Sequence, residues 1–226
     1  MDRRIAAAFV LLLGAVSTSV FAQNCQPLDI VFVIDRTGSI RDNNVPRDCP
    51  ADTECDNWLK MRNFVNSLIE NITPDEDTRF GAVVFGNNND VDTTVVFTLT
   101  DDRTSAQSQI TNIPYRAHFT STYRGIREAR FNVFTQEGDR ANVPNVIILI
   151  TDGNPNLFDG GAQVVNEEQA VIDAVAQAEG AMNDQIFMLV VGVTSAVDEA
   201  TITSLASDEI GTTSPVSDKK TMVFYC

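Results

Sequence analysis

The sequence has little positive charge for its size. Its 226 residues include 31 acidic and 16 basic side chains, which gives a formal net charge of -15. A field of this sign repels phosphate backbones, so the composition argues against a nucleic-acid partner. The chain also has no glycine-rich loop of the kind that binds nucleotide phosphates, which argues against an ATP-linked function.

Histidine is nearly absent, because His118 is the only one. The four cysteines, Cys25, Cys49, Cys55 and Cys226, do not have the spacing of a paired zinc knuckle, so we do not expect a structural zinc site. The sequence also offers no evident pair of a nucleophile and a neighbouring base. We therefore predict that the protein is not an enzyme.

Long apolar runs are absent except at the N-terminus. Two arginines precede an apolar run over residues 5–16, and small residues at 20–22 suit signal-peptidase cleavage. The run is short for a membrane-spanning helix. We therefore predict a signal peptide over residues 1–22, no membrane span, and a secreted, extracellular protein. Residues 23–226 are enough for one sizeable hydrophobic core.

Secretion would place the four cysteines in an oxidising compartment. Cys49 and Cys55 enclose the short polar loop PADTE, and we predict a disulfide between them. Four cysteines allow three pairings. The partners of Cys25 and Cys226 stay open, because these two could pair with each other or Cys226 could form an intermolecular bond. The only glycosylation sequon begins at Asn71, which is the candidate glycosylation site.

Apolar runs that suit buried strands alternate with helical patterns along the chain. We expect strands at 28–34, 79–85, 93–99, 146–150, 186–193 and 221–225, and helices at 57–71, 102–113, 122–133, 167–182 and 198–206. Such alternation is typical of a mostly parallel sheet with helices on both faces. The turn-rich GNNND between the second and third strands indicates one antiparallel edge strand. The predicted fold class is therefore α/β, doubly wound and Rossmann-like.

Oxygen-bearing side chains follow two of the buried strands. Asp35, Thr37 and Ser39 come after the first strand, and Asp152 comes after the strand at 146–150. A threonine-rich loop, FTSTYRG, leads into a later helix. Binding sites in open parallel sheets lie beyond the carboxyl ends of the strands. Such oxygens suit Mg²⁺ or Mn²⁺, although the same residue types also make ordinary turns and helix caps.

These three motifs resemble the metal-ion-dependent adhesion site of von Willebrand factor type A domains. FVIDRTGSI resembles the D-x-S-x-S loop of the family, with Thr37 in place of the commoner first serine. FTSTYRGIREA resembles its threonine segment and ILITDGNPN its T-D-G segment. The resemblance covers about residues 28–225. It implies Mg²⁺ or Mn²⁺, with Ca²⁺ less favoured, as the metal held by Asp35, Thr37, Ser39, Thr120 and Asp152.

The resemblance also implies a function. In the family, one coordination position is open, and a Glu or Asp carboxylate of the ligand completes it. We therefore expect a secreted, divalent-metal-dependent adhesion module that recognises a protein or extracellular-matrix ligand. The alternative is a structural matrix component in which the metal site is incidental. Chelators would abolish ligand binding only in the first case.

Two residues at the rim of this site stay open to interpretation. Arg36 could steer an acidic ligand, or it could be a solvated loop residue that offsets the local negative charge. Phe119 stands just before Thr120, where many family members have Gly or Arg, so the rim of the site is unusual.

The C-terminal end departs from the pattern of the family, which continues past its sixth strand into a final helix. The sequence therefore predicts a von Willebrand factor type A domain over 23–226 that lacks this helix, or else a truncated chain. Without the helix, apolar surface would be exposed. Hydrophobic or disulfide-linked self-association is then expected.

Overall fold

The computed structural model describes residues 27–42, 56–72, 78–86, 93–117, 119–136, 138–153, 155–156, 167–194 and 197–207. Several sequence predictions lie outside these residues and stay predictions. They are the signal peptide, the pairing of all four cysteines, the strand at 221–225 and the missing C-terminal helix.

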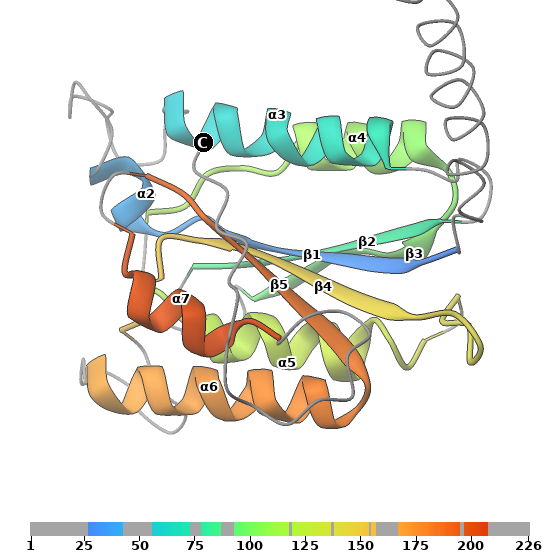
Figure 1. Ribbon diagram of the computed structural model, residues 1–226. Helices are drawn as coiled ribbons and strands as arrows, with labels where there is room; N and C mark the ends of the chain where they lie inside the picture. The colour runs from blue at the N-terminus through green and yellow to red at the C-terminus, as the bar shows by residue number, and fades with distance from the viewer. Residues whose placement is uncertain are drawn as a thin grey trace, which may run out of the picture.

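The core of the molecule is a five-stranded sheet (Figure 1). Its strand order is β3-β2-β1-β4-β5, and β3 is antiparallel to its neighbour while all other pairs are parallel. The strands are β1 (Asp29–Asp35), β2 (Arg79–Phe85), β3 (Thr94–Thr100), β4 (Asn145–Thr151) and β5 (Ile186–Gly192). The prediction of a mostly parallel sheet with one antiparallel edge strand is therefore confirmed.

The central strand β1 shows why its sequence is a continuous apolar run. All seven of its residues are buried. Successive side chains of a strand point to opposite faces of the sheet. Phe32 and Ile34 accordingly pack in the core on one face, and Val31 and Val33 pack in the core on the other. Helices cover both faces, so neither face can be polar.

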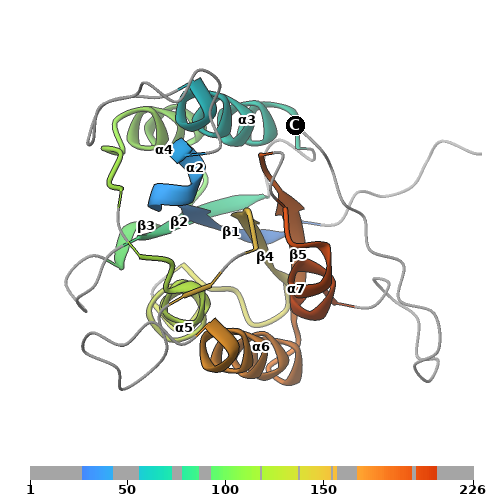
Figure 2. The ribbon, with the colours of Figure 1, turned by 90° about the vertical axis from the view of Figure 1, so that its left-hand side faces the viewer.

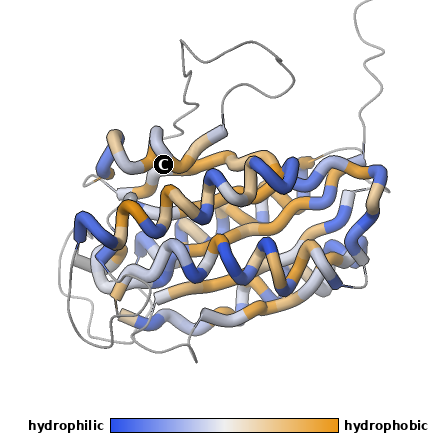
Figure 3. Tube along the Cα trace, turned by 90° about the horizontal axis from the view of Figure 1, so that it is seen from below, coloured by the Kyte–Doolittle hydropathy of each residue, from blue (hydrophilic) through white to orange (hydrophobic). Residues whose placement is uncertain are grey.

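Helices flank the sheet on both sides, as predicted for a doubly wound fold. One face is covered by α3 (Asp56–Asn71) and α4 (Arg103–Thr111) (Figure 1). The other is covered by α5 (Thr122–Asn132), α6 (Glu167–Asn183) and α7 (Glu199–Leu205). Figure 3 shows this second face from outside, where polar and apolar residues alternate along the helices. Among the described residues, no helix combines the length and apolar character that a bilayer span requires.

One short helix was not expected from the sequence. This helix, α2 (Gly38–Asp42), directly follows β1. Five residues are too few to show helical periodicity. Its Ile40 is buried in the core beside α3, and the Asn57 side-chain amide donates a hydrogen bond to the Ile40 carbonyl at 3.0 Å. These contacts hold α2 against the start of α3 and place Ser39 in a helical turn.

The carboxyl ends of β1, β2, β4 and β5 lie at one edge of the sheet, because these strands are parallel. Figure 2 views the molecule from this edge, with α2 in front of the strand ends and the start of α5 below it. This is the edge at which the sequence places the oxygen-bearing side chains.

Candidate metal centre

Asp35 is the last residue of β1, and its side chain is completely buried. The backbone N–H of Thr37 donates to Asp35 Oδ1 at 2.9 Å, and the Thr151 hydroxyl donates to Oδ2 at 2.7 Å. The Thr151 hydroxyl in turn accepts a hydrogen bond from the Gly153 N–H at 3.1 Å. The carboxylate is thus oriented from both sides by the ends of β1 and β4.

The two hydroxyls that follow β1 lie side by side. Thr37 Oγ1 and Ser39 Oγ are 3.1 Å apart, and the Tyr115 hydroxyl donates to the Thr37 carbonyl at 2.8 Å. Neighbouring ligands of an octahedral Mg²⁺ lie roughly 3 Å apart, because each is about 2.1 Å from the metal. The spacing of the two hydroxyls therefore suits two adjacent ligands of one small cation.

Asp152 brings a second carboxylate to the same edge. It directly follows β4, it is fully buried, and its backbone carbonyl accepts a hydrogen bond from the Asp198 N–H at 3.0 Å. Ile34 pairs with Ile150 across the two strands, which brings the two aspartates close together. Burial, and after it the negative charge of Asp152, raises the pKa of Asp35 from 3.8 to about 7.

The electrostatics of this pair favour a bound cation. Two buried carboxylates repel each other and lose their hydration, and both effects oppose ionisation. A divalent cation would offset both negative charges at once. The chemistry of the donor set therefore fits the kind of metal that the sequence predicts.

Thr120 reaches the same edge from a separate loop. It is 1% exposed, its N–H donates to Asn156 Oδ1 at 2.7 Å, and its carbonyl accepts from the Asn156 N–H at 3.0 Å. Asn156 belongs to the loop that also carries Asp152. Two hydrogen bonds thus fix the threonine loop to the T-D-G loop. Sequence reasoning missed this role of Asn156, although the residue closes the quoted ILITDGNPN stretch.

Two further hydroxyls follow Thr120 at the start of α5. Ser121 and Thr122 are buried, and their side-chain oxygens have no hydrogen-bond partner among the described residues. An unsatisfied buried hydroxyl costs about 1–3 kcal/mol. Oxygen donors at this point are thus available to a cation or to its bound water.

The donor atoms of the site are almost all oxygens of hydroxyl and carboxylate groups. Within the described ranges, no group of three or more His, Cys, Asp or Glu residues is positioned to hold a metal ion. The donor set consists of two carboxylates and several hydroxyls. Hard oxygens of this kind suit Mg²⁺ or Mn²⁺ better than a softer metal.

Arg36 and Phe119 behave differently at the rim. Arg36 is only 5% exposed, and its guanidinium donates from Nη1 to the Pro114 carbonyl at 3.3 Å. The interpretation of Arg36 as a solvated loop residue is therefore wrong, because it packs beneath the segment after α4. Phe119 is 36% exposed, so an aromatic ring borders Thr120 at the surface.

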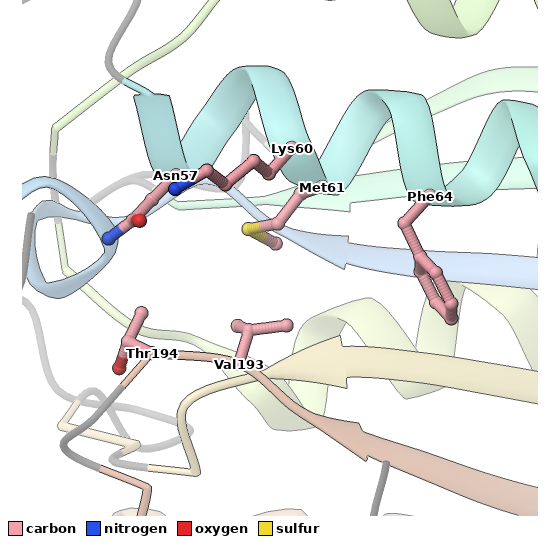
Figure 4. A pocket seen from close by; sticks show the side chains of 6 residues that line it. All are labelled: Asn57, Lys60, Met61, Phe64, Val193 and Thr194. Carbon is pink, nitrogen blue, oxygen red and sulfur yellow. The ribbon is translucent and has the colours of Figure 1, made fainter. Parts of the chain in front are cut away.

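A small cavity lies between α3 and the end of β5 (Figure 4). Its volume is about 30 Å³, which is room for a water molecule or two but not for an organic substrate. The side chains that line it are Asn57, Lys60, Met61, Phe64, Val193 and Thr194.

Comparison with known sequences identifies related proteins. The sequence model of the von Willebrand factor type A domain matches residues 29–222. Matrilin-3 of Gallus gallus is 32% identical over 136 residues, which are 58% of this chain and 26% of the relative. The collagen alpha-4(VI) chain of Mus musculus is 26% identical over 171 residues, which are 74% of this chain and 6% of the relative. The chain thus spans about a quarter or less of these relatives.

Solved structures share the fold. Proximal thread matrix protein 1 from the mussel byssus has a TM-score of 0.60 at 23% identity, over 81% of this chain and 40% of that one. Another structure of this mussel protein has zinc in its metal-ion-dependent adhesion site (MIDAS) motif. It has a TM-score of 0.59 at 24% identity, over 80% of this chain and 39% of that one. The manganese-loaded TRAP protein of Plasmodium vivax has a TM-score of 0.62 at 19% identity. The match covers 89% of this chain and 68% of that one. With the match over residues 29–222, the chain belongs to the von Willebrand factor type A domain family.

Proposed function

We propose that this protein is a secreted adhesion module that binds a protein or matrix ligand through a divalent cation. The observation that carries the proposal is the meeting of buried carboxylates and paired hydroxyls at one edge of the sheet. Asp35 and Asp152 supply negative charge there, and the Thr37 and Ser39 hydroxyls lie 3.1 Å apart.

Each residue has a distinct role in this proposal. The hydroxyls of Thr37, Ser39 and Thr120 bind the cation directly. Asp35 already accepts two hydrogen bonds, so it and Asp152 contribute mainly charge, directly or through bound water. A bound Mg²⁺ or Mn²⁺ would supply one open coordination position, which suits a carboxylate oxygen of a ligand.

The setting of the ligand is inferred from the relatives and the sequence. The relatives include a matrilin, a collagen chain and a thread matrix protein. Together with the signal peptide expected over residues 1–22, these names support an extracellular matrix environment. A ligand that bears an exposed Glu or Asp is the partner class that fits the open position. Membership of this family supports the role of a binding module rather than that of an enzyme.

The rival proposal is a structural matrix component in which the metal site is incidental. A pull-down from matrix extract with the chain from residue 23 separates the two. Proteins retained in Mg²⁺ should be released by EDTA and should not be retained by Asp152→Asn. Glu179→Gln, at an exposed position on α6, is the matched control and should retain the same proteins as the wild type. Retention that is equal in Mg²⁺ and EDTA would favour the structural role.

A further inference from the structure

A groove adjoins the candidate metal centre on the side of α4. Its volume is about 500 Å³, and it lies between the end of α4, the start of β3 and the residues that follow α4. In Figure 2 this last segment runs on the left from α4 towards α5. The groove is large enough for one or two amino-acid side chains of a bound partner.

The charge of the groove differs from that of the whole chain. Two arginines, Arg36 and Arg116, line it, and no acidic residue is among the described residues of its walls. The whole chain carries 31 acidic and 16 basic residues. The described walls of the groove therefore carry two positive charges and no negative one, which suits an acidic group of a ligand.

Hydrogen bonds join the groove to the metal centre. Arg36 follows Asp35 directly, its N–H donates to the Phe85 carbonyl at 3.1 Å, and its guanidinium donates to the Pro114 carbonyl. The neighbouring Tyr115 donates to the Thr37 carbonyl. Hydrogen bonds thus tie the wall of the groove directly to the hydroxyl loop.

Arg116 differs from most arginines of the described part. It is exposed, and no hydrogen bond or ion pair joins it to another described residue. Other arginine side chains instead donate to backbone carbonyls or carboxylates of the protein itself; these are Arg62, Arg79, Arg103, Arg130 and Arg140. The Arg116 guanidinium is therefore free to pair with a carboxylate of a ligand.

The walls of the groove also have apolar parts. Val84, Val95 and Ile113 line it, and the exposed Phe119 lies further along the same segment, next to Thr120. A sulfated polysaccharide would satisfy the arginines but would leave these apolar side chains without contacts. A peptide offers acidic and apolar side chains together, so the lining favours a peptide.

We infer that the groove holds a second acidic side chain of the ligand whose first carboxylate completes the metal coordination. The ligand is then an extended peptide segment with two acidic residues and apolar residues between them. This inference rests on the proposed metal-dependent binding and specifies the partner class of that site.

Labelled synthetic peptides can test the inference by fluorescence anisotropy. One set of ten-residue peptides carries a single Glu among Gly, Ala and Val, and a second set adds another Glu two to six residues away. An extended chain advances about 3.3 Å per residue, so this series scans the distance from the metal to the groove. All binding is measured in Mg²⁺ and again in EDTA.

The wild type should bind the two-Glu peptide of the best spacing about two- to fivefold more tightly than the one-Glu peptide, as expected for an exposed ion pair. Arg116→Gln should remove this preference and keep Mg²⁺-dependent binding of the one-Glu peptide. Arg116→Lys should keep part of the preference. Lys60→Gln, which removes an exposed positive charge outside the groove, is the matched control and should keep all of it.

Three results would overturn the inference. Equal Mg²⁺-dependent binding of one-Glu and two-Glu peptides at every spacing would overturn the role of the groove and leave the proposed function intact. No peptide binding above the EDTA level, together with no effect of Mg²⁺ on the melting temperature, would overturn both. Arg116-dependent binding of heparin without any peptide preference would identify a general polyanion site instead.

Discussion

Asp35 carries much of the electrostatic behaviour of the site. Its pKa is raised to about 7 by burial and by Asp152, whereas the unfolded chain should have the ordinary value of 3.8. Between these pH values the folded protein binds more protons than the unfolded one. The free energy of unfolding contributed by this group therefore falls as pH rises from about 4 to 7.

We predict that Asp35→Asn stabilises the metal-free protein relative to the wild type, and that the difference grows with pH. Asparagine keeps the shape of the side chain but cannot ionise. Urea unfolding in EDTA at pH 4.5 and pH 7.5 measures the difference. Added Mg²⁺ should reverse the order at pH 7.5, because only the wild type offers both carboxylate charges to the cation. A stability difference that is the same at both pH values would contradict the prediction.

The hydroxyl pair allows a matched test at the same scale. Ser39→Ala should weaken Mg²⁺ binding at least tenfold, since it removes one of two oxygens that lie 3.1 Å apart. Thr37→Ser keeps its oxygen and should bind Mg²⁺ like the wild type. Titration calorimetry gives both affinities. Equal affinities for Ser39→Ala and the wild type would remove Ser39 from the ligand set.

At the scale of elements, the position of Thr120 depends on how closely α5 approaches the sheet. A Cβ atom on Gly125 would lie 2.7 Å from Phe85 and 2.8 Å from Val33. Only glycine allows this approach, and these neighbours are core side chains that cannot move freely. The helix α5, which begins beside Thr120, can therefore lie this close to the sheet only because residue 125 has no side chain.

We predict that Gly125→Ala lowers the free energy of unfolding by about 1–3 kcal/mol, the usual effect of overpacking. It should also weaken Mg²⁺ binding, because the start of α5 moves away from β1. Gly180→Ala in α6 is the comparison, because the added methyl group would displace the Arg130 guanidinium from Asp184 and Gln177, away from the metal centre, and should leave the Mg²⁺ affinity unchanged. Chemical denaturation and calorimetry of both variants provide the comparison. Metal affinity unchanged in Gly125→Ala would show that Thr120 does not depend on this contact.

The elements differ in how far the sequence could predict them. The buried strands are continuous apolar runs, so β1 and β4 were placed within a residue or two. The helix α2 was missed because five residues carry no period. The burial of Arg36 depends on the Pro114 carbonyl, which is 78 residues away in the sequence. Such contacts need the tertiary structure, and so does the link between Asn156 and Thr120.

At the scale of the whole molecule, the two ends of the parallel strands differ in how their buried carboxylates are neutralised. At the edge opposite the metal centre, the buried Asp29 pairs with Arg140, with Oδ1 at 2.6 Å from Nη2. The backbone N–H of Arg140 also donates to Asp29 Oδ2 at 3.1 Å. This edge therefore has its own positive charge. At the metal edge, two buried carboxylates lie near each other, so stability there depends on what the site binds.

This difference predicts separable effects on stability and on metal binding. Arg140→Ala should lower the free energy of unfolding by about 2–4 kcal/mol, because it leaves a buried carboxylate without its partner. Mg²⁺ binds only the folded state, so at a hundredfold excess over its dissociation constant it should add about 2.7 kcal/mol to wild type and Arg140→Ala alike. Asp152→Asn should fold but lose most of that gain. Denaturant unfolding of the three proteins with Mg²⁺ or EDTA measures all six stabilities. If Arg140→Ala also lost the gain, the edges would be coupled; if Asp152→Asn kept it, Asp152 would not hold the cation.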